Sequence, residues 1–139
     1  MALTPKYSTE VVNAEANAKA TLFNNGYLRL YDSTGGTGQP ATVNTAIGSQ
    51  VLLAELRFNP TAFGAAVEGV ITAAAFTQDA SANATGTATW YRCLKSDGTS
   101  PLHDGSVGTS GCNLNINSTS IVTGSPVEVS AFTLTVPKQ

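Results

Sequence analysis

His103 is the only histidine in the chain and the first residue that could do chemistry. A Ser–His–acid triad would have to use it, with Ser100 or Ser106 as the nucleophile. Asp104 is adjacent, but neighbouring side chains in a strand point to opposite faces, so Asp104 could not orient the imidazole ring. An acid from elsewhere in the chain is the open alternative. We interpret His103 as a surface or sheet-edge histidine and predict that the chain is not an enzyme.

The acidic residues do not form a catalytic or metal-binding pattern. They are spread along the chain at Glu10, Glu15, Asp32, Glu55, Glu68, Asp79, Asp97, Asp104 and Glu128. Glycoside hydrolysis needs two carboxylates across a cleft, and this spacing nominates no pair. Asp97-Gly98 and Asp104-Gly105 could together bind calcium, but calcium takes several oxygen ligands from a denser acidic cluster. We therefore interpret both dipeptides as turns and predict no metal and no cofactor.

Two cysteines, Cys93 and Cys112, are too few for a structural zinc site, which uses about four ligands. A reducing compartment favours two small buried thiols. The alternative is a disulfide that forms after release from a cell.

The composition is low in charge. Only 12% of the residues are charged, against about 25% in an average globular protein, and we interpret the surface as one that neighbouring subunits cover. The alternative is a β-domain whose surface is simply rich in threonine and serine. The basic residues are scattered, so we expect no nucleic-acid partner.

Membrane insertion and secretion are not expected either. No apolar run approaches the roughly 20 residues that span a bilayer. Residues 1–13 lack the basic start and apolar stretch of a secretory signal. We expect the protein to be made and assembled in a cytoplasm.

A helix is predicted over residues 8–25, which contain no glycine or proline and are rich in alanine. Ser8 or Thr9 can cap its start, and Asn25-Gly26 supplies the left-handed stop. The predicted apolar stripe is Val11, Ala14, Ala18 and Leu22. The helix either packs on its own domain or serves as an arm that reaches a neighbouring subunit.

Strands are predicted after Gly26, because the hydrophobic period changes to two. The alternation of apolar and polar residues is clearest over residues 27–32 and 50–58, and further strands are expected within 67–77, 84–94 and 114–136. A bulge near Ser130-Ala131 would bring both halves of the last strand to the core. Trp90 and Tyr91 should lie on opposite faces, one in the core, with Trp90 as the default, and the other facing outward.

The predicted fold class is all-β: an antiparallel β-sandwich (jelly-roll-like) with one N-terminal α-helix. The chain is expected to be a single domain, residues 1–139, with an N-terminal arm or helix over 1–26 and the sandwich over 27–139. The loop over residues 33–46 is glycine-rich and expected to be exposed. It does not match a phosphate-binding loop, because Gln39-Pro40 stands where that motif needs Lys and Ser/Thr.

Several segments resemble small structural proteins of tailed bacteriophages. They run in order along nearly the whole chain: residues 26–32 (GYLRLYD), 39–41 (QPA), 53–58 (LAELRF), 59–64 (NPTAFG), 84–92 (ATGTATWYR), 104–109 (DGSVGT) and 114–117 (LNIN). These are turn and strand signatures, and none of them is catalytic. The longer loop over residues 33–39 and the two cysteines depart from the pattern.

The resemblance implies a virion structural protein without enzymatic activity. A capsid decoration (cement) protein is the first expectation, located on the capsid surface, bound to the major capsid protein or other virion proteins, and assembled as a homo-oligomer such as a trimer. The expected partner-contact residues are Tyr7, Tyr27, Tyr31, Gly35, Gly36, Gln39 and Tyr91. The alternatives are a tail or baseplate subunit, and a receptor- or carbohydrate-binding module that uses exposed tyrosines at 27, 31 or 91.

Overall fold

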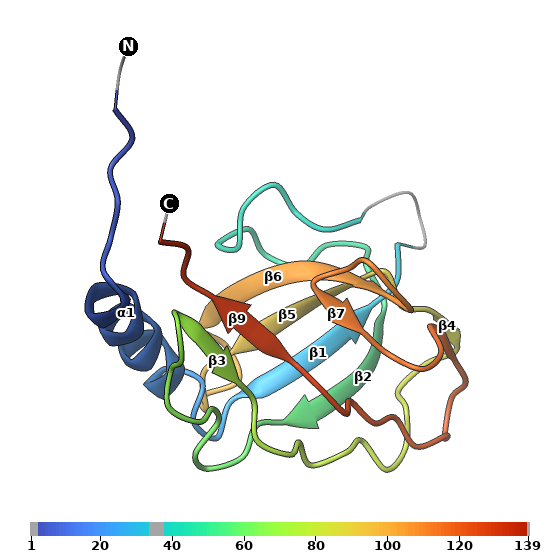
Figure 1. The fold of residues 1–139 in the computed structure, drawn as a ribbon. Coiled ribbons are helices and arrows are strands. Elements are labelled where there is room, and N and C mark those ends of the chain that lie inside the picture. The colour runs from blue at the N-terminus through green and yellow to red at the C-terminus, as the bar shows by residue number, and fades with distance from the viewer. Residues whose placement is uncertain (1–2, 34–37, 139) are drawn as a thin grey trace.

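The computed structural model describes residues 3–33 and 38–138, and within them the protein is mostly β with one N-terminal helix (Figure 1). The elements in chain order are α1 (Thr9–Thr21), β1 (Tyr27–Tyr31), β2 (Leu52–Arg57), β3 (Val70–Thr72), β4 (Gly86–Thr87), β5 (Trp90–Leu94), β6 (Pro101–Gly108), β7 (Leu114–Asn115), β8 (Ser120–Ile121) and β9 (Thr133–Thr135). No helix in the described segments is long and apolar enough to cross a membrane.

The main sheet has five strands in the order β2-β1-β5-β6-β7, and it is mixed. The first four strands are antiparallel, but β6 and β7 are parallel, with Val107 opposite Leu114. The prediction of a purely antiparallel sheet is therefore wrong at this edge. A compact return loop makes the parallel pair: the Asn113 side-chain oxygen accepts hydrogen bonds from the backbone N–H and the hydroxyl of Ser106.

Two antiparallel pairs complete the fold, β3 with β9 and β4 with β8. In Figure 1 the β3–β9 pair lies in front of the main sheet, with α1 beside β3. A ring contact joins these layers, since Phe132 before β9 meets Tyr91 of β5 edge-on at 5.4 Å between ring centroids. The core therefore lies between one face of the main sheet and the α1, β3 and β9 elements.

The helix forms where it was predicted, from Thr9 to Thr21. The Ser8 hydroxyl accepts a hydrogen bond from the Val11 backbone N–H at 3.2 Å, which caps the first turn. The helix ends before the predicted stop at Asn25: its C-cap, Leu22, is right-handed, and the left-handed residue Asn25, with φ of 58°, lies in the turn that follows.

The apolar stripe of the helix was predicted on the wrong face. The helix buries Val12, Ala16 and Ala20, while Val11 and Leu22 are exposed. Alanines lie on both sides of this helix, so hydrophobic periodicity does not distinguish the predicted stripe from the buried one. Close packing determines which side is buried. Gly69 lets the backbone before β3 approach the helix, because a Cβ at Gly69 would lie only 3.1 Å from the Val12 side chain.

The first two strands confirm the alternation argument. Leu28 and Leu30 of β1 and Leu56 of β2 are fully buried. Leu30 pairs with Ala54 and Tyr31 pairs with Leu52, so one residue of β2 is left between the two pairs as a bulge. That residue, Leu53, is also buried, which period-two alternation alone does not predict.

Most of the remaining strands are shorter than predicted, and β6, the longest strand in the described residues, was not predicted. Within residues 67–77, 84–94 and 114–136, only parts pair as β3, β4, β5, β7, β8 and β9. The expected change of parity near Ser130-Ala131 is present, because Val129 and Phe132 are both buried. Regular pairing of the last strand begins only at Thr133.

One predicted turn is confirmed and the other is wrong. Asp97-Gly98 is a turn, with Gly98 at φ of 72°. Hydrogen bonds from Ser100, its hydroxyl first, lower the pKa of the Asp97 carboxyl to about 2. Asp104-Gly105 instead lies inside β6, opposite Arg92 and Tyr91. Two long-range contacts override its turn chemistry, an ion pair at Asp104 and the Tyr91 ring lying over Gly105.

All five phenylalanines of the sequence lie in one aromatic cluster. Phe58 is its centre, with ring-centroid distances of 5.4 Å to Phe23, 5.8 Å to Phe63, 4.7 Å to Phe76 and 6.3 Å to Phe132. The cluster joins the end of α1, the end of β2 and the segment before β9. It is therefore the part of the core that holds the helix and the C-terminal segment on the sheet.

Candidate interaction surfaces

One face of the main sheet carries all three arginines of the chain. Strand pairing places them together, because Tyr27 is opposite Arg57 and Arg29 is opposite both Glu55 and Arg92. Each arginine has a partner. Arg29 binds Glu55 at 2.6 Å, and Arg57 lies over the Tyr27 ring at 4.2 Å from its centroid.

The third arginine, Arg92, forms a buried ion pair. Its Nε and Nη2 donate to the two carboxylate oxygens of Asp104 at 2.7 and 2.8 Å, and Nη1 donates to the Thr45 carbonyl at 2.7 Å. The two side chains are only 4% and 5% exposed. The hydrogen bonds to Asp104 raise the pKa of Arg92, although burial opposes this. The pair is satisfied within the fold, so its role is structural.

A hollow of about 390 Å³ lies beside this pair, between the sheet face and the loop through Thr45. Arg29, Tyr31 and Arg92 line it, and both arginines are already paired with carboxylates. Next to it, the Trp90 ring stacks on Tyr31 at 4.6 Å. The Trp90 indole N–H is buried with no hydrogen-bond partner in the described part of the chain.

The structure places the predicted contact residues in different environments. Tyr7 and Gln39 are exposed and Tyr27 is half-buried, whereas Tyr31 and Tyr91 are buried. Gly35 and Gly36 lie outside the described residues. The tyrosines at 31 and 91 therefore do not form the exposed aromatic platform expected for a glycan.

The prediction that either Trp90 or Tyr91 faces outward is also wrong, because both are buried. They do lie on opposite faces, and each face is covered. Trp90 is covered through its stack on Tyr31, and Tyr91 through its contact with Phe132.

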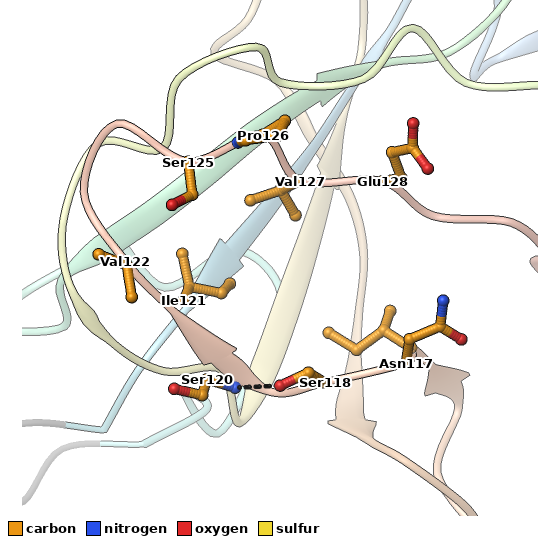
Figure 2. Close-up of a pocket in the computed structure, with 10 residues that line it drawn as sticks. Asn117, Ser118, Ser120, Ile121, Val122, Ser125, Pro126, Val127 and Glu128 are labelled. Atoms are coloured by element: carbon orange, nitrogen blue, oxygen red, sulfur yellow. Dashed lines mark hydrogen bonds between the residues drawn. The ribbon is translucent and has the colours of Figure 1, made fainter.

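A shallow groove of about 430 Å³ lies between β8 and the segment over residues 125–128 (Figure 2). Its walls mix the apolar side chains of Ile121 and Val127 with the hydroxyls of Ser118, Ser120 and Ser125. Glu128 is the one ionisable residue of the lining, and Figure 2 shows its carboxylate away from the Ser118 and Ser120 hydroxyls. No base therefore lies against these hydroxyls in the groove.

His103 is half-buried and lies where β6 is paired only with β5, as expected of a sheet-edge histidine. Its Nδ1 lies 3.1 Å from the Tyr91 hydroxyl, and the two rings stack at 5.6 Å. The Asp104 carboxylate binds Arg92 on the other face, which confirms that it does not orient the ring. Burial, with a smaller effect of Lys19, lowers the pKa of His103.

A polar cavity of about 280 Å³ opens at this histidine. Five parts of the chain contribute to it: Lys19 from α1, Tyr91 from β5, His103 from β6, Asn113 from the return loop, and Thr133, Leu134 and Thr135 from β9. Sequence reasoning missed this cavity, because its residues come from distant segments. The only local signal was the single histidine itself.

Cys93 and Cys112 are both free thiols. The Cys93 side chain is fully buried on the core face of the sheet, and its burial raises the pKa of the thiol well above its usual value. Cys112 is half-buried in the return loop before β7. Within residues 3–33 and 38–138, no group of three or more His, Cys, Asp or Glu side chains is placed to hold a metal ion.

Comparisons with protein-family models, with curated proteins and with solved structures found no match to this chain.

Proposed function

We propose that this chain is a structural protein of a tailed-bacteriophage virion. Within that class, we propose a capsid decoration protein that binds the major capsid protein on the outside of the head and stabilises it. The virion class rests on the resemblance of the short segments, and the observation that supports a contact role within that class is an exposed arm with two large apolar side chains, defined here as residues 3–8 before α1. The proposal includes a homo-oligomer, with a trimer as the first expectation. It also includes a jelly-roll-like β-sandwich fold in which the β3–β9 pair is the second layer.

The arm has the character of a segment that another molecule covers. Its side chains Leu3 and Tyr7 are 90% and 48% exposed. The helix also exposes Val11 and Leu22, so four of the seven large apolar side chains that are exposed in the described chain fall in the first part of the sequence: Leu3, Tyr7, Val11 and Leu22.

The arm is anchored to the body of the protein at Tyr7. The Tyr7 backbone N–H donates to the Lys138 carbonyl at 2.9 Å, and Figure 1 shows the preceding residues leading away from the body of the protein. This geometry supports a segment that reaches a neighbouring subunit. The low charge of the chain supports it as well, because few charges need to be desolvated when such a surface is buried.

The proposal is tested with the double substitution Leu3→Glu and Tyr7→Glu. Two charges on the arm should weaken binding to heads, stripped of this protein, by at least about tenfold, which corresponds to 1.4 kcal/mol. The melting temperature should stay the same, because both side chains are exposed. Co-sedimentation of the variant with heads measures the binding, and a thermal scan checks the fold.

Val67→Glu with Val122→Glu is the matched control, because these side chains are 70% and 53% exposed but lie outside the arm. The control should bind heads as the unmodified protein does. Equal binding by the arm variant, or an equal loss in the control, would contradict the role of the arm.

A further inference from the structure

We propose that the cavity lined by Lys19 and His103 binds a small carboxylate. This inference does not depend on the virion role. The cavity brings together the Lys19 ammonium group, the His103 imidazole and the Asn113 amide around a small space, and it lies apart from the arm.

Tyr91 fixes the hydrogen-bonding state of His103. The phenol is fully buried, and its burial raises the pKa of the hydroxyl well above the usual value, so it stays protonated. The His103 Nδ1 lies 3.1 Å from this hydroxyl and is the hydrogen-bond partner that the described structure gives it, so we take the hydroxyl as the donor and Nδ1 as the acceptor. When Tyr91 donates to Nδ1, the imidazole proton must be on Nε2, which is then a donor.

Tyr91 is itself held in place by the sheet. It pairs with Gly105 of β6, and a Cβ at that position would lie only 2.5 Å from the Tyr91 hydroxyl oxygen. The glycine therefore lets the phenol cross over β6 toward His103. Tyr91 acts as a positioning residue, because it lies beneath the cavity and works through the imidazole.

The charges near His103 favour an anion in the cavity. Lys19 from α1 is the cation in the lining, and β9 contributes only Thr133, Leu134 and Thr135. The carboxylate nearest in sequence, Asp104, is bound to Arg92 on the opposite face of the sheet. On β5, the Cys93 thiol opposite His103 stays neutral because its pKa is raised. Lys19 is thus a cation without a carboxylate in the cavity lining.

A carboxylate fits these donors better than a neutral ligand does. It accepts several hydrogen bonds at once, here from an ammonium, an imidazole N–H and an amide. Asn113 supplies the amide, while Leu134, whose side chain packs against the core, gives an apolar wall for a short alkyl chain. A carboxylate next to the imidazole also favours its protonated form, so binding should raise the pKa of His103.

The test is a titration of the intact protein with butyrate at constant ionic strength, followed by the ¹⁵N NMR signals of the imidazole. Because the chain has one histidine, the assignment is unambiguous. We expect a saturable shift and a higher His103 pKa in the bound state. Butyramide, the neutral analogue of butyrate, should produce neither.

Matched variants localise the effect. Lys19→Gln should weaken butyrate binding at least about tenfold, whereas Lys95→Gln, a lysine outside the cavity, should leave it unchanged. Tyr91→Phe keeps the ring but removes the hydroxyl, so the ¹⁵N shifts should report a mixture of imidazole tautomers in place of one. No saturable shift with butyrate, an equal response to butyramide, or normal binding by Lys19→Gln would overturn the proposal.

A second ligand separates two sources of the carboxylate. N-acetyl-aspartate amide carries the carboxylate as a protein side chain does. If it binds more tightly than butyrate, the site takes an acidic side chain of a partner, and if butyrate binds more tightly, the site takes a free small acid. Either order supports a carboxylate site.

Discussion

Asp104→Ala is expected to lower the free energy of unfolding by about 3–5 kcal/mol, because it leaves the buried Arg92 guanidinium without its counter-charge. The two side chains are 4% and 5% exposed, so the guanidinium that remains is largely shielded from water. Urea unfolding followed by Trp90 fluorescence measures the loss. The slope with urea should not change if the variant still unfolds in two states.

Two controls separate the ion pair from a general effect of mutation on this face. Glu55→Gln breaks the more exposed pair with Arg29 and should cost less than about 1 kcal/mol. Arg92→Met with Asp104→Leu removes both buried charges and should recover most of the stability. A loss of less than about 1 kcal/mol in Asp104→Ala would contradict the structural role of the pair.

Phe58→Ala is expected to lower the free energy of unfolding by about 3–5 kcal/mol through the cavity that it leaves. Phe58 contacts four other phenylalanines, so the loss is shared by α1, β2 and the segment before β9. Chemical denaturation measures this loss in the free energy of unfolding. Val122→Ala is the control at an exposed site and should change the stability by no more than about 0.5 kcal/mol.

A small effect of Phe58→Ala would mean that the aromatic cluster does not hold the helix and the C-terminal segment on the sheet. Hydrogen exchange adds a second observation. In the variant, the amides of α1 should lose more protection than those of β5 and β6, because the central strands keep their ladder.

Local patterns predicted the elements whose structure is set by neighbours in sequence. The capped helix and the strands β1 and β2 follow from alanine content, the Ser8 cap and strict alternation. Asp104-Gly105 was misjudged because its turn preference is local, whereas its ion pair and its contact with Tyr91 come from another strand. The buried stripe of α1 depended on Gly69, which is far along the chain and lets β3 approach.

In the candidate sites, too, local features could be predicted and features set by distant segments could not. The exposure of Tyr7 follows from its place before the helix, but the burial of Tyr31 and Tyr91 depends on Trp90 and Phe132. The cavity at His103 could not be predicted, since it forms only when α1, β6 and β9 meet. The virion role comes from the resemblance of short segments and stays a prediction.

Quantitative mass spectrometry of heads and tails, purified separately from virions made by cells that express this chain, tests the central claim most directly. The decoration role predicts many copies of the chain in each head, in a fixed ratio to the major capsid protein, and none in purified tails. Detection in tails alone would contradict that role and favour a tail or baseplate subunit. Absence from both fractions would contradict the virion assignment itself.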